Sequence, residues 1–412
     1  MSKKILIIGN SPKAYSLAKF LSKNNIIFVA PGSDTMKDFA NCIDIREDSI
    51  SELLEFVLEN DIDITIPISE KSLNTELVDI LANNNQQVFA PSLATVETIL
   101  NKSSAKKILY KLRIPTPKFG IFEKAALAYD YIRNIKPPFI IKTNEPSSAV
   151  VLTSQKLAKN IIDSLLNDKK QKVIIEDYIW GTPFSFYVLT DGYKALPLGS
   201  SIVYRHLLDG DGGQLTSGMG ACSPNYKFSL EFENYIMNEV VYPTLGYLEK
   251  NNSPYLGILG INGVIANNRL EIIGFQNFMQ DVDCSAILEN LDIDLLELIE
   301  SCIIGSFSDE INYIPLKDIS ATSLVLTCKN KNNVENIIKG LDSVDENIKI
   351  EFYPQVSKNK YLELEAEHGA VLIMTATAQT LSSSTKLIYD EASCIDFNGK
   401  AFRNDICKAF DL

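Results

Sequence analysis

Residues 4–21 have the sequence KILIIGNSPKAYSLAKFL, in which a strand pattern changes directly into a helix pattern. The run at 5–8 is wholly apolar and ends at Gly9. Ser11 can cap a helix that begins with Pro12, because the fixed backbone angle of proline fits the first helical turn. Apolar residues then recur at helical spacing. The stretch therefore predicts a strand, a tight turn and a helix.

The same alternation continues through the first hundred residues. Apolar runs at 26–29, 62–66 and 88–89 are each preceded by a helical or turn segment. A repeated strand–helix–strand pattern is typical of a parallel sheet. The turn after the first strand reads GNSPKA and lacks the three glycines of GxGxxG, which argues against an NAD or FAD site.

Ligands of parallel sheets usually bind beyond the carboxyl ends of the strands. Gly9 and Asn10 follow the first predicted strand, and Glu70 follows the third. We therefore expect these three residues to bind a phosphate or sugar group. Ordinary turn formation is the alternative interpretation of the same residues.

Composition narrows the classes of function. The chain has 412 residues and a net charge of −13, and its basic residues are mixed with acidic ones, so no nucleic-acid partner is expected. No run of 18 uncharged apolar residues and no signal peptide is visible, so we expect a cytoplasmic protein without a membrane segment. The cysteines are scattered and include no CxxC pair, which favours free thiols. They are Cys42, Cys222, Cys284, Cys302, Cys328, Cys394 and Cys407.

A second unit follows the first hundred residues. A helix is predicted at 101–112, and residues 125–190 predict a small α/β lobe with strands FIIK and AVVL. A polar, glycine-rich segment at 207–224 precedes a helix and a β pair, and further strands, among them SCIDF, are expected from about residue 327.

Several ordered segments resemble the glycinamide ribonucleotide synthetase family, also called phosphoribosylamine–glycine ligase, of the ATP-grasp superfamily. KILIIGN, VAPG, VIIEDYIWG and HGAVLIMTATAQTL are similar to family segments over nearly the whole chain. The most specific stretch is DGDGGQLTSGMGACSP at 209–224, which resembles a family pattern close to DxDxGPNTGGMGAYSP.

The resemblance implies an α/β and α+β multidomain fold. A parallel-sheet N-terminal domain is expected at 1–101. An ATP-grasp core is expected at 102–326 with a lid at about 123–189, and a C-terminal α/β domain at 327–412. The family joins glycine to 5-phosphoribosylamine in purine biosynthesis and uses ATP with Mg²⁺ or Mn²⁺. A monomer or weak homo-oligomer is expected.

Site residues follow from the motif positions. The resemblance assigns nucleotide binding to Lys106, Lys142 and Glu176. It assigns substrate binding to Gly9, Asn10, Glu70, Asp209, Asp211, Gly213, Thr216, Gly218, Met219 and Gly220. No catalytic residue is assigned.

The nucleotide motifs depart from the family pattern. The segment after Lys142 reads TNEPSSAVV, where the family has a glycine-rich loop that ends in a lysine. Glycines let backbone N–H groups close on phosphate, whereas Pro146 has no N–H to offer. Val150 stands at the position of the loop lysine. A simple hairpin connection is therefore the alternative interpretation of this loop.

The metal motif departs as well. Gly274 and Gln276 stand where the family has a glutamate and an asparagine, and glycine offers no side-chain oxygen to Mg²⁺. Asp281 and Asp283 are the nearest carboxylates that could substitute. Two hypotheses therefore stand: a divergent ligase, and a catalytically degenerate paralogue that binds a ligand or partner.

Overall fold

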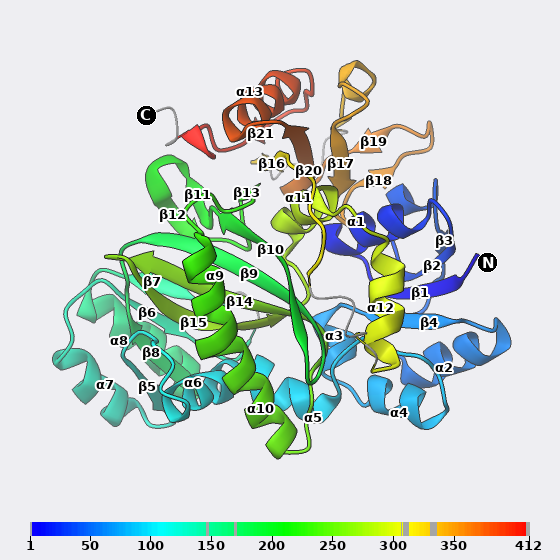
Figure 1. Cartoon of the computed structure of the whole chain (residues 1–412). Helices are drawn as coiled ribbons and strands as arrows, with labels where there is room; N and C mark the ends of the chain where they lie inside the picture. The colour runs from blue at the N-terminus through cyan, green and yellow to red at the C-terminus, as the bar shows by residue number, and fades with distance from the viewer. Residues whose placement is uncertain are drawn as a thin grey trace.

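The structure, a computed structural model, describes residues 2–145, 148–168, 171–305, 307, 313–329 and 336–408. The N-terminal part is a parallel sheet of order β3–β2–β1–β4, as the alternation predicts (Figure 1). The predicted strand at 88–89 forms only one bridge, between Val88 and Thr65. The elements are β1 (Lys4–Gly9), α1 (Pro12–Leu21), β2 (Ile26–Pro31), β3 (Asn41–Cys42), α2 (Ile50–Glu59), β4 (Ile64–Pro67), α3 (Glu70–Leu73) and α4 (Leu77–Asn83).

The lid is an antiparallel sheet of order β5–β8–β6–β7 that carries two helices on one face (Figure 1). Ile132, Phe139, Ile162 and Val173 are fully buried between sheet and helices, so the lobe has a core of its own. Helix α6 (Lys102–Lys111) leads into it. The lid elements are β5 (Phe119–Phe122), α7 (Ala125–Arg133), β6 (Phe139–Lys142), β7 (Val150–Leu152), α8 (Gln155–Asp163) and β8 (Val173–Asp177).

A large sheet forms the centre of the molecule, in the order β15–β14–β9–β10–β13–β16–β20–β17, with β21 beside β16. Its strands are β9 (Thr182–Asp191), β10 (Ala195–Val203), β13 (Gly220–Ser223), β14 (Leu256–Ala266), β15 (Arg269–Asn277), β16 (Ser320–Cys328), β17 (Lys349–Phe352), β20 (Gly369–Ala378) and β21 (Lys400–Ala401). The boundary expected at 326–327 falls within β16, so this sheet continues from the core into the C-terminal part. The three-domain division stays a prediction.

Helices cover the faces of this sheet (Figure 1). They are α9 (Leu230–Ile236), α10 (Tyr242–Lys250), α11 (Asp281–Asn290), α12 (Leu295–Ile303) and α13 (Leu381–Ala392). Helix α11 packs between the sheet and α1, and one buried cluster includes Ile5, Leu17, Ile287 and Met374. The N-terminal sheet is therefore packed firmly against the central sheet.

Two expectations from the sequence are wrong. The segment SCIDF, at 393–397, forms one isolated bridge at Asp396 instead of a strand. Cys222 and Cys407, which were expected to be free thiols, form a disulfide with a Cα–Cα distance of 6.6 Å. The sequence separation of 185 residues explains why spacing gave no signal for this pair. Asn398 and Gly399 form the turn that leads from the bridge into β21.

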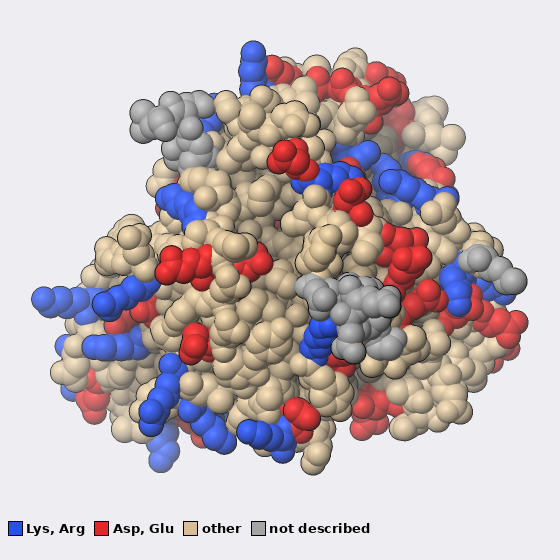
Figure 2. Space-filling model, in the orientation of Figure 1, with Lys and Arg blue, Asp and Glu red and all other residues tan. Residues whose placement is uncertain are grey.

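Surface charge is mixed on the face shown in Figure 2, where basic and acidic side chains are interspersed on a neutral background. Within the described ranges, no helix is long and apolar enough to cross a membrane.

Candidate active site

Two lysines and one glutamate meet in the interior between the lid and helix α6. The Lys142 Nζ atom lies 2.5 Å from Glu176 Oε1, and the Lys106 Nζ atom lies 2.8 Å from Glu176 Oε2. Lys106 also donates to Thr116 Oγ1, which donates to the carbonyl oxygen of Ile272 on β15. All three predicted nucleotide-binding residues therefore come together, although they lie on three different elements.

Burial and neighbouring charges shift the pKa values of Glu176 and Lys106 in opposite directions. Burial works against ionisation of Glu176, but the charges of Lys142 and Lys106 outweigh it and hold its pKa below the usual range. Burial lowers the pKa of Lys106 to about 8, although the carboxylate of Glu176 opposes that shift. A fixed, buried cluster of cations beside one carboxylate is an arrangement that can bind an anion.

The loop between β6 and β7 is tied to the first turn of α6. The Lys102 ammonium donates to the carbonyl oxygen of Glu145 at 2.5 Å, and the N–H of Ser103 donates to Asn144 Oδ1 at 3.0 Å. Ser148 Oγ lies 3.3 Å from Lys102 Nζ. Pro146 lies outside the described residues. Oxygen atoms of the loop thus accept hydrogen bonds from the first turn of α6. The N-terminus of a helix commonly binds phosphate.

A cavity of about 610 Å³ opens where the lid joins the central sheet. Tyr178, Ile179 and Trp180, which follow β8, line one side, and residues of the β14–β15 hairpin line the other. The rings of Tyr178 and Trp180 lie 4.7 Å apart in an edge-to-face arrangement. Glu271 lines the cavity and acts electrostatically on Lys106. The cavity can hold a planar aromatic group next to the lysine cluster.

The positions at which the family pattern has its metal ligands lie on β15. Gly274 lies opposite Asn262 on β14, and a Cβ atom at Gly274 would meet no atom within 4 Å. The Oε1 atom of Gln276 accepts hydrogen bonds from Asn262 at 2.7 Å and from Gln280 at 2.5 Å. The Nε2 atom of Gln276 donates to the Tyr187 hydroxyl at 2.7 Å. Amides thus satisfy one another where the family pattern has a glutamate and an asparagine.

Asp281 and Asp283, the carboxylates named as possible substitutes, both accept hydrogen bonds from protein groups. Asp281 accepts the backbone N–H of Lys13 at 3.1 Å. Asp283 is fully buried, and its Oδ2 atom accepts hydrogen bonds from Tyr187 and Ser201, both at 2.8 Å. Burial raises the pKa of Asp283 to about 6.

The side chains around this position do not fit Mg²⁺. Magnesium prefers carboxylate and other hard oxygen ligands in a near-octahedral shell. Gly274 supplies no oxygen, and the oxygen of Gln276 already accepts two hydrogen bonds. The guanidinium of Arg205 lies 3.4 Å from Asn262 Oδ1, which brings a positive charge to the same place. Among the residues that the structure describes, no cluster of three metal-binding side chains of the His, Cys, Asp or Glu type occurs.

The predicted substrate segment forms a hairpin and the strand that follows it. Strands β11 (His206–Leu208) and β12 (Gly212–Leu215) pair with each other, and Asp209 and Asp211 lie in the turn between them. Both carboxylates contact C-terminal residues, Asp209 the backbone of Asn404 and Asp211 the guanidinium of Arg403. Their expected role in substrate binding stays a prediction.

Close packing explains why two positions of this segment are glycines. Gly218 has φ +142°, and a Cβ atom there would lie 2.6 Å from Val282 on α11. A Cβ atom at Gly220 would lie 2.7 Å from the carbonyl oxygen of Ser323 on β16. The remaining predicted residues of the segment are Gly213, which has φ +77°, Thr216, which bonds the carbonyl of Arg205, and Met219, which is buried.

The predicted residues of the N-terminal sheet lie at its carboxyl edge. A Cβ atom at Gly9 would contact Ile68 and Ser69, so the ends of β1 and β4 are adjacent there. Asn10 follows Gly9, and Glu70 begins α3. The charge of Glu70 acts on Lys102 at the start of α6. The charge of this edge therefore acts on the start of α6.

Sequence reasoning missed the polar network around Gln276. Tyr187 comes from β9, Asn262 from β14 and Gln280 from the turn before α11. Alternation along β14 and β15 could have shown that Asn262 and Gln276 share a face. The link to Tyr187 has no local signal, because it depends on strand order.

Comparisons with known proteins agree with this architecture. Family models match residues 3–97, described as phosphoribosylglycinamide synthetase, N domain, and residues 100–284, described as its ATP-grasp (A) domain. A phosphoribosylamine–glycine ligase from Halalkalibacterium halodurans is 28% identical over 416 residues, covering 98% of this chain and 96% of the relative. One from Brucella melitensis is 27% identical over 419 residues, covering 98% and 97%.

Solved structures share the fold. The crystal structure of phosphoribosylamine–glycine ligase from Thermotoga maritima matches with a TM-score of 0.81 at 20% identity, covering 98% of this chain and all of the other. The biotin carboxylase domain of a Hydrogenobacter thermophilus 2-oxoglutarate carboxylase, solved with MgADP, matches with a TM-score of 0.74 at 12% identity. It covers 97% and 92% of the two chains. The expected multidomain α/β fold of the ATP-grasp type is confirmed.

Proposed function

We propose that this chain, which belongs to the phosphoribosylglycinamide synthetase family, joins glycine to 5-phosphoribosylamine at the expense of ATP. The observation that carries the proposal is the ion-paired cluster of Lys106, Glu176 and Lys142 beside the cavity at the lid hinge. A ligase of this kind must hold a nucleotide and fix its phosphates while a carboxylate is phosphorylated. Such catalysis depends on positioning and on neutralising charge.

The chain offers groups for the base and for the phosphates of the nucleotide. The cavity beside Tyr178 and Trp180 takes the base. An ammonium has three N–H donors, and the contact with Glu176 uses only one of those of Lys142. Lys142 and Lys102 can therefore donate to phosphate oxygens once the loop residues bonded to Lys102 move. Glu176 holds the lysines in place while these contacts form.

Magnesium is the unmatched component. Members of the ATP-grasp family use ATP and magnesium, which binds the phosphates and offsets their charge. The residues at Gly274 and Gln276 do not supply its ligands. The proposal therefore assigns no step to a protein-bound cation and rests on the lysines alone.

The direct test is phosphate release from ATP that requires both glycine and freshly generated 5-phosphoribosylamine. We expect release above background with the unmodified protein and none when either substrate is omitted. Lys142→Met should abolish it, whereas Lys156→Met on the exposed face of α8 should not. Absence of substrate-dependent release from a folded wild-type protein would overturn the proposal.

A second candidate function has its own supporting observation. The hydrogen-bonded amides around Gln276, with an arginine nearby, favour a non-catalytic paralogue that binds a ligand at the same site. Nucleotide binding by calorimetry, without phosphate release, would support this candidate. Turnover that depends on both substrates would rule it out.

The setting of the reaction is part of the proposal. We place the protein in the cytoplasm as a monomer or weak homo-oligomer without a nucleic-acid partner. The mixed surface charge in Figure 2 supports the last point. Light scattering of the purified chain, with and without a DNA duplex, tests the oligomeric state and the absence of a nucleic-acid partner.

A further inference from the structure

Residues 403–407, near the C-terminus, lie against the hairpin β11–β12. Arg403 is buried, with 2% of its surface exposed. Its Nε and Nη2 atoms donate to the carboxylate of Asp405 at 2.8 and 2.7 Å. Its Nη1 atom donates to Asp211 at 3.0 Å and to the carbonyl oxygen of His206 at 3.1 Å. One guanidinium thus joins the C-terminal segment to the first residue of β11 and to the turn of the hairpin.

Backbone groups complete the connection. The N–H of Asn404 donates to Asp209 Oδ1 at 2.8 Å, and its side-chain amide donates to Oδ2 at 3.1 Å. In return, the N–H of Gly210 donates to Asp405 Oδ2 at 2.8 Å. The turn has no buried residue of its own, so these contacts, more than packing, define its position.

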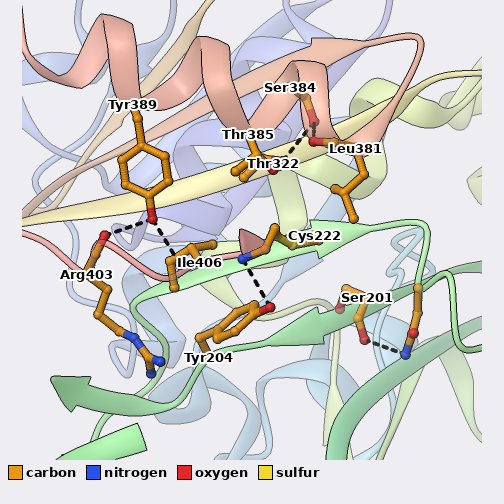
Figure 3. Close-up of a disulfide and its surroundings, with 12 residues drawn as sticks. Ser201, Tyr204, Cys222, Thr322, Leu381, Ser384, Thr385, Tyr389, Arg403 and Ile406 are labelled. Atoms are coloured by element: carbon orange, nitrogen blue, oxygen red, sulfur yellow. Dashed lines mark hydrogen bonds between the residues drawn. A yellow bond between two sulfur atoms is a disulfide. The ribbon is translucent and has the colours of Figure 1, made fainter. Parts of the chain in front are cut away.

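A covalent bond anchors the segment to the central sheet. Figure 3 shows the disulfide region, in which the Tyr204 hydroxyl accepts the N–H of Cys407 at 3.1 Å. The Tyr389 hydroxyl donates to the carbonyl oxygen of Arg403 and accepts the N–H of Ile406. Cys222, the partner of Cys407, lies on β13, the strand at the end of the glycine-rich segment.

The hairpin touches the lid on its other side. Residues of β12 lie next to β7, the strand that follows the loop at the lysine cluster. The hairpin therefore connects the C-terminal segment to the edge of the lid. A change in the anchoring of residues 403–407 can therefore reach β7 and the loop between β6 and β7 through the hairpin.

We propose that residues 403–407 form a strap that positions hairpin β11–β12 beside strand β7 of the lid, and that the Cys222–Cys407 disulfide makes this strap sensitive to thiol reductants. Arg403 is then a positioning residue, because its contacts are with the hairpin and its own segment. Any effect on ligation rests on the proposed function, whereas the effect on hairpin order does not.

The redox step balances with a dithiol as reductant. A thiolate of the dithiol attacks one sulfur of the bridge and forms a mixed disulfide, and one cysteine leaves as thiolate and takes up a proton. The second thiol of the dithiol then displaces the other cysteine. The protein gains two thiols and the dithiol becomes a cyclic disulfide. Since Cys222 and Cys407 are both buried, reduction requires the strap to open.

Hydrogen exchange of the full-length protein tests the strap without relying on activity. Mass spectrometry first counts the thiols of aerobically purified protein. Exchange of backbone amides in 206–215 is then compared before and after treatment with dithiothreitol. We expect one disulfide, and a rise of at least tenfold in hairpin exchange after reduction, with β1 and β2 unchanged. Protein purified without the disulfide would overturn the proposed sensitivity to reductants. An exchange rate in 206–215 that is the same before and after reduction would also overturn it.

Variants separate positioning from general stability. Arg403→Gln should raise exchange in 206–215 in the oxidised protein, and Arg403→Lys should restore only part of the protection because lysine cannot reproduce the forked contacts. Lys358→Gln, which removes the ion pair with Asp38 far from the hairpin, is the matched control. If Arg403→Gln fails to fold, Asn404→Ala serves the same comparison. Unchanged hairpin exchange, or an equal rise over the whole chain, would overturn the positioning role.

Discussion

Lys142 and Glu176 lie on neighbouring strands of the lid, and their charged atoms are 2.5 Å apart in the interior. Glu176 also holds Lys106 at 2.8 Å, so one carboxylate serves two ammonium groups. The three side chains join the lid to α6, because Lys106 belongs to that helix. The pairing between lid and core is therefore in part electrostatic.

Removal of the shared carboxylate should destabilise the protein. Glu176→Gln leaves two buried ammonium groups without a counter-charge, and breaking a buried ion pair in this way costs about 3–5 kcal/mol. Urea unfolding followed by circular dichroism measures the change. Glu123→Gln, which removes the exposed pair with Lys172, is the matched control and should leave the midpoint unchanged. Equal midpoints for wild type and Glu176→Gln would contradict this interpretation.

A second buried carboxylate predicts a pH dependence. Glu351 on β17 is buried, with Ser285 Oγ donating to its Oε1 atom at 2.7 Å, and burial raises the pKa of Glu351 to about 7. Between about pH 4.5 and 7 the folded state then holds more protons than the unfolded state, so stability falls as pH rises through this interval.

Glu351→Gln should remove the loss of stability that accompanies the rise in pH. The variant should match wild type at pH 5 and exceed it at pH 8 by about 3 kcal/mol, the value of a shift of roughly 2.5 pKa units. Urea unfolding at both pH values is the measurement. Glu363→Gln at the surface should keep the wild-type difference between the two pH values. A wild-type protein equally stable at pH 5 and pH 8 would argue against a buried, titrating Glu351.

The sequence predicted the parts of this molecule that have local signals. Apolar runs located β1, β2 and β6, and the segment beginning at Asn101 gave helix α6, where Asn101 caps the first turn. The motif positions of Lys106, Lys142 and Glu176 placed three residues that meet in space. Each of these inferences needs only neighbouring residues or a family pattern.

Contacts between distant strands could not be predicted in the same way. The disulfide links β13 to a residue 185 positions away, and Asp209 and Asp211 find their partners at Asn404 and Arg403. Such pairs depend on strand order in the central sheet, which the sequence pattern does not specify.

The missing loop lysine predicts a gain from restoring it. Val150 at the start of β7 is exposed, so lysine fits without disturbing the core. One charge-assisted contact with phosphate contributes roughly 1.5–3 kcal/mol, so Val150→Lys should tighten ATP binding about tenfold or more. Quenching of Trp180, which is the only tryptophan and lines the cavity, gives the signal. Leu157→Lys adds the same charge to the exposed side of α8, and an equal gain there would point to charge alone.

Restoring the expected metal ligands should require two changes together. Gly274→Glu is sterically allowed because a Cβ atom there meets nothing within 4 Å. By itself it leaves Gln276 bonded to Asn262 and Gln280, so its oxygen stays occupied. Gln276→Asn shortens that side chain and breaks the network, but adds no carboxylate. When several groups act together in phosphoryl transfer, restoring one of them alone raises activity only slightly.

We therefore expect Gly274→Glu and Gln276→Asn to change substrate-dependent phosphate release less than twofold each, and the double variant to raise it at least tenfold. The rise should need Mg²⁺, because only the double variant offers a carboxylate and a free amide oxygen on one face of β15. Gly246→Glu is the matched control, since that glycine on α10 also has open space around it and lies on the outer helix layer. A tenfold gain from Gly274→Glu alone would show that the amide network around Gln276 does not keep the cation out.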